Sequence, residues 1–162
     1  MKRSLILLAM LAACRHKGGD ARPTYDDSLL APDAKGLKVG LATLDDVTKA
    51  FPAAEVNKDK SLGGTDIVEY NGDKAIHING QAVNAHVVNG KLVHLIVHGP
   101  GLYDWLVGKM DGMAGSKDCP GNRKMGKSGG EAAYCASAGD KVVFIEAHKG
   151  GDEDELDYHV VK

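Results

Sequence analysis

The sequence predicts an α+β fold built from tandem helix-plus-antiparallel-meander units, which form a mainly antiparallel sheet with helices on one face. The first observation behind this prediction is the dipeptide Asn-Gly, which occurs three times between residues 65 and 98. Asn-Gly is the strongest short-range hairpin signal, because both residues tolerate the positive φ of a type I′ turn. The second observation is that each group of strand-like runs follows a segment with apolar residues at helical spacing.

The first predicted helix begins after Thr43. A hydroxyl at this position and the carboxylate of Asp46 three residues on form a capping-box pattern. Leu44, Val47 and Phe51 recur at the spacing of one helical face. Pro52 ends the helix, which is short and therefore depends on packing for its stability.

Four strand-like runs follow, separated by the Asn-Gly pairs. Connections this short require antiparallel neighbours, so the runs predict a four-stranded meander. The runs are 65–70, 74–78, 82–88 and 91–98.

A second unit begins after Gly99-Pro100-Gly101. The spacing of Leu102, Trp105, Leu106 and Met110 predicts a helix. Residues 112–130 are rich in Gly and Lys and predict a loop, followed by strands near 131–137, 140–148 and 156–161. We therefore expect a single domain over residues 37–162, with possible half-repeats at 37–98 and 99–162.

The amino-terminal stretch predicts export. Lys2 and Arg3 precede an apolar run that is too short to span a membrane, and small residues follow it. Residues 1–13 therefore predict a signal peptide. Residues 14–36, rich in Gly, Pro, Asp and Lys, predict a flexible tether.

The segment Leu11-Ala12-Ala13-Cys14 resembles the lipobox of bacterial lipoproteins. The resemblance implies cleavage before Cys14, acylation of that cysteine, and attachment to a membrane through its lipid. The residue after it is Arg15 rather than the aspartate that retains some lipoproteins at the inner membrane. We therefore expect a lipid-anchored protein of the cell envelope, at the outer membrane of a two-membrane cell.

A second resemblance concerns the domain itself. Gly40-Leu41-Ala42-Thr43, followed by Val47 and Pro52, resembles the opening of small SmpA/BamE-type lipoprotein modules. The tandem order of helix and meander is similar to the beta-lactamase-inhibitor-protein arrangement. These likenesses imply a helical layer on a curved antiparallel sheet and a protein-binding role.

The remaining cysteines and the net charge narrow the class further. Cys119 and Cys135 are the two cysteines left over in an exported chain, and such a pair predicts a disulfide. The alternative is half of a metal site, but the two cysteines do not have the CxxC spacing and there is no second pair. The net charge is −2, and loss of Lys2 and Arg3 makes it more acidic. This acidity disfavours nucleic acid as a partner.

Three histidines form a candidate metal site. By their parity on adjacent predicted strands, His86, His94 and His98 are expected to share one sheet face, and His77 precedes them. Paired strands bring such side chains within reach of one ion, whose natural ligands include imidazole. The alternative is that they are polar residues on the wetter face of the sheet.

One motif matches a nucleotide-binding pattern but lacks its context. Residues 121–128 fit the P-loop expression, which needs a strand before it and a helix after it. Here Cys119-Pro120 precedes the motif and Gly129-Gly130 leads into a strand, so we expect no nucleotide and no cofactor. The acidic run at residues 152–157 lacks the spacing of an EF-hand.

The sequence therefore predicts a non-enzymatic, lipid-anchored envelope protein that acts as a protein-binding or structural module. The alternative function is a metal-binding or sensing lipoprotein that uses the strand histidines. The common hydrolase, zinc-protease and haem signatures are missing from the sequence.

Overall fold

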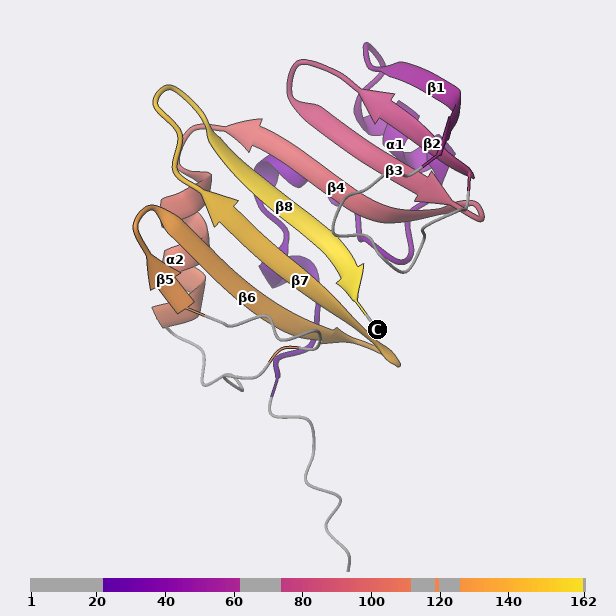
Figure 1. Cartoon of the computed structure of the whole chain (residues 1–162). Helices are drawn as coiled ribbons and strands as arrows, with labels where there is room; N and C mark the ends of the chain where they lie inside the picture. Colours follow the sequence, from indigo (N-terminus) through magenta and orange to yellow (C-terminus); the bar gives the residue numbers. More distant parts are fainter. Residues whose placement is uncertain (1–21, 62–73, 112–118, 120–125, 162) are drawn as a thin grey trace, which may run out of the picture.

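The structure, a computed structural model, describes residues 22–61, 74–111, 119 and 126–161 (Figure 1). These residues form two α-helices, two short 3₁₀ turns and an eight-stranded antiparallel sheet, which makes the fold a predominantly sheet-based α+β fold. The elements are η1 (Asp27–Leu29), η2 (Pro32–Ala34), α1 (Leu44–Ala50), β1 (Glu55–Ser61), β2 (Lys74–Asn79), β3 (Val83–Val88), β4 (Lys91–Gly99), α2 (Leu102–Asp111), β5 (Gly126–Ser128), β6 (Glu131–Ala138), β7 (Lys141–His148) and β8 (Asp154–Val161).

Two meanders join edge to edge in this sheet. The strand order is β1-β2-β3-β4-β8-β7-β6-β5, so the last strand of each meander pairs with the last strand of the other. The join runs from the pair His94↔His159 to the pair Gly99↔Asp154. Residues that are far apart in the sequence therefore lie side by side at the centre of the sheet (Figure 1).

Local signals behave as predicted at several points. Asn89 and Gly90 both have positive φ, 50° and 75°, and form the two-residue turn between β3 and β4. At α1, the Thr43 hydroxyl accepts from the backbone N–H of Asp46, whose carboxylate accepts from the backbone N–H of Thr43. The capping box and the helix end before Pro52 are therefore confirmed.

Two strands differ from the prediction. The predicted strand at 65–70 and the turn at 71–72 lie outside the described residues, while β1 forms earlier in the chain, at Glu55–Ser61. Six of the seven residues of this segment are charged or polar, and it pairs with β2 alone, which suits an edge strand but gives no apolar period to detect. Likewise β5 lies inside the predicted loop 112–130.

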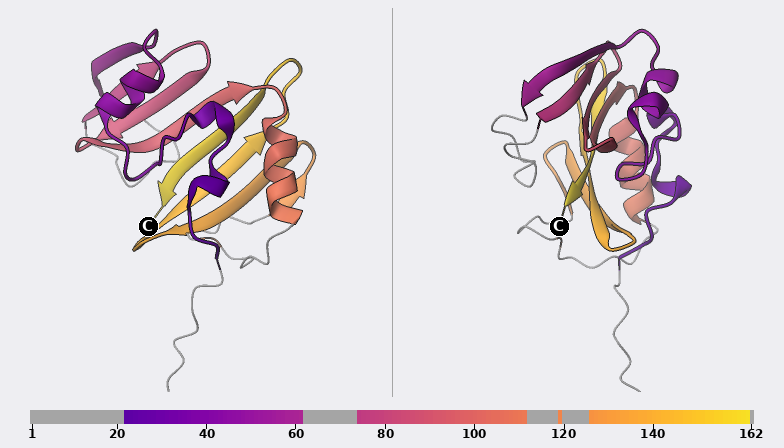
Figure 2. Two further views of the ribbon diagram at one scale, coloured as in Figure 1. Left: turned by 180° about the vertical axis from the view of Figure 1, so that it is seen from behind. Right: turned by 90° about the vertical axis from the view of Figure 1, so that its right-hand side faces the viewer.

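Residues 22–36 also differ from the flexible tether expected over 14–36. The backbone of Ser137 bonds to this segment twice, accepting from Tyr25 N–H at 2.8 Å and donating to Pro23 O at 2.8 Å. Further on, Ala31 N–H donates to the Tyr158 hydroxyl at 3.0 Å. Four of its apolar side chains are buried in the main core, namely those of Tyr25, Leu29, Ala31 and Ala34. From behind, the indigo segment crosses the sheet (Figure 2), and its burial explains why it is ordered.

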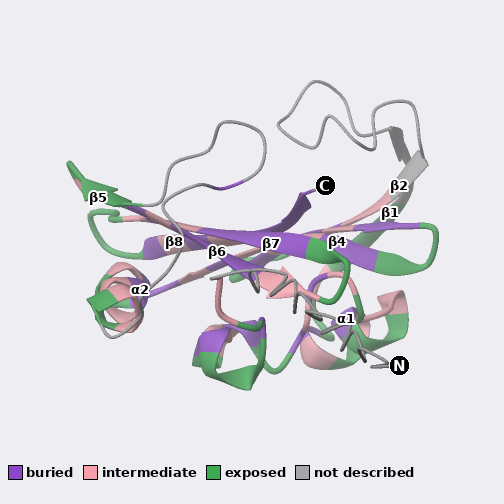
Figure 3. Ribbon diagram, turned by 90° about the horizontal axis from the view of Figure 1, so that it is seen from below, coloured by how far each residue is buried: buried purple, intermediate pink, exposed green. Residues whose placement is uncertain are grey.

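The sheet has two chemically different faces because alternate residues of a strand point to opposite sides. One face, the core face, carries the main hydrophobic cluster, including Leu95, Ile145 and Tyr158. The other, the histidine face, carries a smaller cluster of Cys119, Cys135, Val142, Phe144 and Val161 beside polar side chains. The strands that carry these two clusters are largely buried along the middle of the sheet (Figure 3).

The helices supply apolar side chains to the main cluster. Val47 of α1 and both Leu102 and Leu106 of α2 belong to it. The N-terminus of α2 is held by Asp154, whose carboxylate accepts from the backbone N–H groups of Tyr103 (3.0 Å) and Gly150 (3.1 Å). Such a carboxylate satisfies backbone donors that a helix leaves unpaired at its start.

Candidate metal centre

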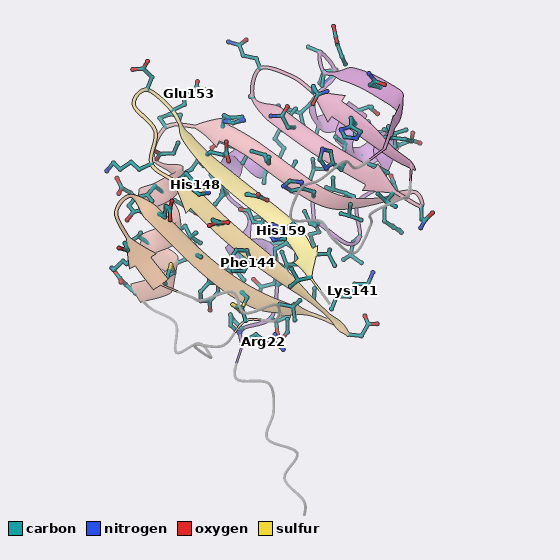
Figure 4. All side chains as sticks on the ribbon, viewed as in Figure 1. Arg22, Lys141, Phe144, His148, Glu153 and His159 are labelled. Atoms are coloured by element: carbon teal, nitrogen blue, oxygen red, sulfur yellow. A yellow bond between two sulfur atoms is a disulfide. The ribbon has the colours of Figure 1, made fainter. Side chains whose placement is uncertain are left out.

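Four histidines lie in a row across four adjacent strands of the histidine face. This histidine row consists of His77 on β2, His86 on β3, His94 on β4 and His159 on β8, each directly opposite the next. The ring centroids are 4.3, 5.0 and 5.8 Å apart in that order. The row continues to Phe144 of β7, at 5.2 Å from His159 (Figure 4).

A β-bulge brings His86 opposite His94. The turn at Asn89-Gly90 pairs Val88 with Lys91 and Val87 with Leu92, so a regular ladder would next pair His86 with Val93. The register shifts between His86 and Val87, and His86 pairs with His94 instead. Because directly opposite residues share a face, the extra residue puts the two histidines on the same side.

Three groups of the histidine face converge on one point. His94, Asp157 and His159 each present one ligand atom, and these atoms all lie within 4.8 Å of one another. Nε2 of His94 lies 2.8 Å from Oδ1 of Asp157, and Nδ1 of His159 lies 3.3 Å from that same oxygen. The three side chains are 12, 17 and 7% exposed, so the site is almost closed to solvent.

Two ring nitrogens at this site lack an aligned hydrogen bond among the described residues. They are the Nε2 atoms of His94 and His159, both buried. For His94 the close approach to Asp157 is an ion pair without hydrogen-bond alignment. Buried polar atoms are nearly always paired, and an ion at the converging groups would satisfy Nε2 of His94, whereas His159 faces Asp157 through its other nitrogen, Nδ1.

The charge balance of the site favours a cation. Burial tends to raise the pKa of Asp157, but the His159 and His94 side chains beside the carboxylate outweigh it, and the pKa lies at about 2. Asp157 is therefore ionised at neutral pH. The neighbouring His86 has its pKa lowered to about 4, first by burial and then by His94 and His77, so its ring is neutral there.

A second carboxylate lies beside the site. Glu146 of β7 pairs with Asp157 of β8, and burial raises the pKa of the Glu146 carboxyl. His148 lies two residues further along β7, and its Nε2 is 3.8 Å from Oε1 of Glu146. This neighbourhood is polar but more exposed than the three converging groups, because the His148 side chain is 41% exposed.

The structure brings together two of the three histidines selected from the sequence. Nδ1 of His86 lies 3.3 Å from Nδ1 of His94. His98 occupies the same face further along β4, opposite Glu155, with its Nε2 3.4 Å from the side-chain nitrogen of Asn84. It is not part of the converging group.

Sequence reasoning missed Asp157 and His159, which β8 contributes. Their Asp-x-His spacing on a predicted strand was the available signal, since residues two apart share a face. The pairing of β4 with β8 joins the two halves of the chain, and no short-range pattern reports it. Without that pairing, neither residue can be placed beside His94.

The predicted disulfide is confirmed. Cys119 and Cys135 are bonded, with Cα atoms 6.1 Å apart, and Cys135 lies opposite Phe144 at the end of the row. The bond leaves neither sulfur as a thiolate ligand. Cys14, the predicted lipidation site, lies outside the described residues.

The P-loop-like segment shows no phosphate-binding geometry where it is described. Gly126–Ser128 forms β5, and Gly129 and Gly130, both at positive φ, turn directly into β6. The helix that would cradle a phosphate is therefore replaced by a hairpin. Residues 121–125 of the motif lie outside the described part of the chain.

Neither a family model, a curated protein nor a solved structure matches the chain. In the described ranges, no helix has the length and apolar content that crossing a membrane requires.

Proposed function

We propose that this chain is a non-catalytic, lipid-anchored envelope protein that binds a divalent transition-metal ion through His94, Asp157 and His159. The observation that carries this proposal is the single buried oxygen of Asp157, which faces two imidazole nitrogens. A carboxylate oxygen between two imidazole nitrogens in a nearly closed site offers a cation the ligand types that it prefers.

The ligand types indicate which ions fit. Two imidazoles and a carboxylate suit Zn²⁺, Cu²⁺ or Ni²⁺, whereas Ca²⁺ and Mg²⁺ prefer oxygen ligands only. Soft ions such as Cu⁺ favour sulfur, and the disulfide withholds both described cysteines. Three protein ligands leave a fourth tetrahedral position for water.

The proposed location rests on the amino-terminal sequence together with the disulfide. The lipobox-like residues ending at Cys14 support a lipid anchor, and Arg15 supports the outer membrane. A disulfide fits an oxidising compartment such as the envelope. Intact-mass measurement on protein from its own host membrane tests this: residues 14–162 plus lipid is the expected mass, and an unacylated chain that begins at Met1 contradicts it.

We also propose the finer architecture predicted from the sequence. The two units would be α1 with β1–β4 and α2 with β5–β8, with both helices layered on the core face. Their shared cluster, which includes Val47 and Leu106, supports this layering. The order of helix and meander is similar to that of beta-lactamase-inhibitor-protein modules, so binding of an envelope protein is the second candidate function. This second function would remain as the proposal if the protein takes up no metal.

Metal titration of the detergent-solubilised full chain tests the main proposal. After chelation and dialysis, we expect one Zn²⁺ per chain by calorimetry and by elemental analysis. His94→Gln should abolish tight binding, because it removes one imidazole ligand while keeping a polar side chain.

His98→Gln is the matched control, since His98 lies on the same strand and face but outside the converging group. Its affinity for Zn²⁺ should equal that of the wild type. Circular dichroism should show the same fold for both variants. Equal binding by His94→Gln and wild type, or no uptake by wild type at millimolar Zn²⁺, would overturn the proposal.

A further inference from the structure

A third histidine, His86, touches the candidate centre without joining its ligand set. Nδ1 of His86 lies 3.3 Å from Nδ1 of His94, and the ring of His86 meets that of His94 edge-on. His86 comes from β3, on the side of β4 opposite to β8, which carries Asp157 and His159. It therefore approaches His94 from behind the centre.

The contact between the two Nδ1 atoms limits the protonation pattern. A neutral imidazole has one N–H donor and one bare acceptor nitrogen. Two Nδ1 atoms at hydrogen-bonding distance must share one proton, so one ring donates and the other accepts. The same ring of His94 presents its Nε2 to Asp157 at 2.8 Å.

A metal ion selects one of the two patterns. An ion at the centre needs the lone pair on Nε2 of His94, so the proton of that ring must lie on Nδ1. From Nδ1 it can be donated to His86 alone among the described contacts of that atom. His86 must then accept at Nδ1 and carry its own proton on Nε2.

We infer that His86 is the positioning residue of the metal centre, which fixes the tautomer and ring orientation of His94 by accepting its Nδ1–H. The inference rests on the proposed metal-binding function. The β-bulge in the β3–β4 hairpin makes this contact possible. A regular hairpin would put Val93 opposite His86 and leave His94 without this acceptor. His77 lies on the side of His86 away from His94, with the two ring centroids 4.3 Å apart, and is not one of the converging groups that an ion would need.

The most direct test is nitrogen-15 NMR of the histidine rings in the full chain in detergent, with and without Zn²⁺. In the zinc form we expect His94 protonated at Nδ1 and bound at Nε2, and His86 bare at Nδ1 and protonated at Nε2. A zinc form with His94 bound through Nδ1, or with His86 protonated at Nδ1, overturns the inference. This measurement needs no substitution.

Variants of His86 provide an independent test. Phenylalanine keeps the aromatic volume but accepts no hydrogen bond, so His86→Phe should weaken Zn²⁺ binding by about 10–100-fold, the usual effect of losing such a supporting partner. One ion per chain should still bind. In His86→Gln the amide oxygen can accept from His94, and most of the affinity should return.

His77→Phe is the matched control, a histidine of the same row that lies one strand further from His94. Its Zn²⁺ affinity should stay within about twofold of the wild type. If wild type binds Zn²⁺ and His86→Phe binds equally well, the inference fails while the proposed function stands. If His86→Phe alters the Co²⁺ absorption spectrum to that of a site with fewer nitrogen ligands, His86 is a ligand and the inference is also overturned. Failure of wild type itself to bind would remove the proposed function.

Discussion

Oδ1 of Asp157 lies 2.8 Å from Nε2 of His94, although the two residues come from different meanders of the sheet. The contact crosses the β4–β8 junction, where the two halves of the chain meet. The candidate centre thus exists only in the folded chain, because separated halves would not hold these groups together. An ion bound there should stabilise the whole sheet rather than one hairpin.

The first prediction is that Zn²⁺ raises the free energy of unfolding. A ligand that binds only the folded state at 100 times its Kd adds about 2.7 kcal/mol. Thermal unfolding of the full chain, with and without Zn²⁺, measures this as a rise in Tm. In Asp157→Asn the carboxylate is lost, so the rise in Tm should disappear.

Glu155→Gln is the control for that substitution. Glu155 lies on the same strand and face as Asp157, two residues away and opposite His98. Its variant should show the full zinc-dependent rise in Tm. An equal rise in Asp157→Asn would show that the ion binds elsewhere.

The second prediction concerns pH in the absence of metal. The pKa of His86 is about 4 in the folded chain against an ordinary value of 6.5. Between these values the unfolded chain binds a proton that the folded chain does not, so stability falls as pH drops from 6.5 towards 4. We expect a loss of about 2 kcal/mol, less than full conversion of the shift because solvent screens a partly exposed ring.

Denaturant unfolding of the chelated protein at several pH values measures this loss. His86→Gln has no titrating group at this position, so its stability should change less between pH 6.5 and 4. Below that range the pKa of Asp157, about 2, causes a further loss in both proteins as the carboxylate becomes protonated. Identical curves for wild type and His86→Gln down to pH 4 would contradict the prediction.

Local sequence signals predicted much of the fold and less of the site. The capping box at Thr43 and the turn at Asn89-Gly90 depend on a few adjacent residues, so the sequence reports them directly. The β4–β8 pairing depends on tertiary packing, and with it the position of Asp157 beside His94. Of the three converging groups, the sequence therefore indicated His94, a histidine on a predicted strand, but neither Asp157 nor His159.

The amino-terminal segment was mispredicted for a related reason. Gly, Pro and Asp in residues 22–36 indicate a loop, and the segment is irregular in the structure apart from two 3₁₀ turns. Composition does not show that Leu29 and Ala34 would be completely buried within this loop. Burial of irregular backbone depends on partners elsewhere, here Ser137 and Tyr158.

The third prediction tests this docked segment. Leu29 is fully buried, so Leu29→Ala removes apolar contacts and leaves a cavity, which should lower the free energy of unfolding by about 2–4 kcal/mol. Leu41→Ala is the matched control, because Leu41 is 65% exposed and the change should cost less than about 0.5 kcal/mol. Chemical denaturation of both variants measures the difference, and similar losses would mean that the segment does not contribute to the core.

The last prediction concerns the disulfide at the end of the histidine row. It closes a loop across a sequence separation of 16 residues, and limiting the unfolded chain in this way is worth about 3 kcal/mol. Reduction of the wild type should lower its free energy of unfolding by about that amount and add the mass of two hydrogen atoms, one on each sulfur. The double variant with Cys119→Ala and Cys135→Ala should be about as unstable as the reduced wild type, and adding reductant should not change its stability.

The disulfide and the candidate centre should act independently. Because Phe144 separates Cys135 from His159 along the row, the zinc stoichiometry should stay at one per chain in the reduced, still folded protein. Loss of the ion on reduction would show instead that the disulfide is needed to maintain the metal centre.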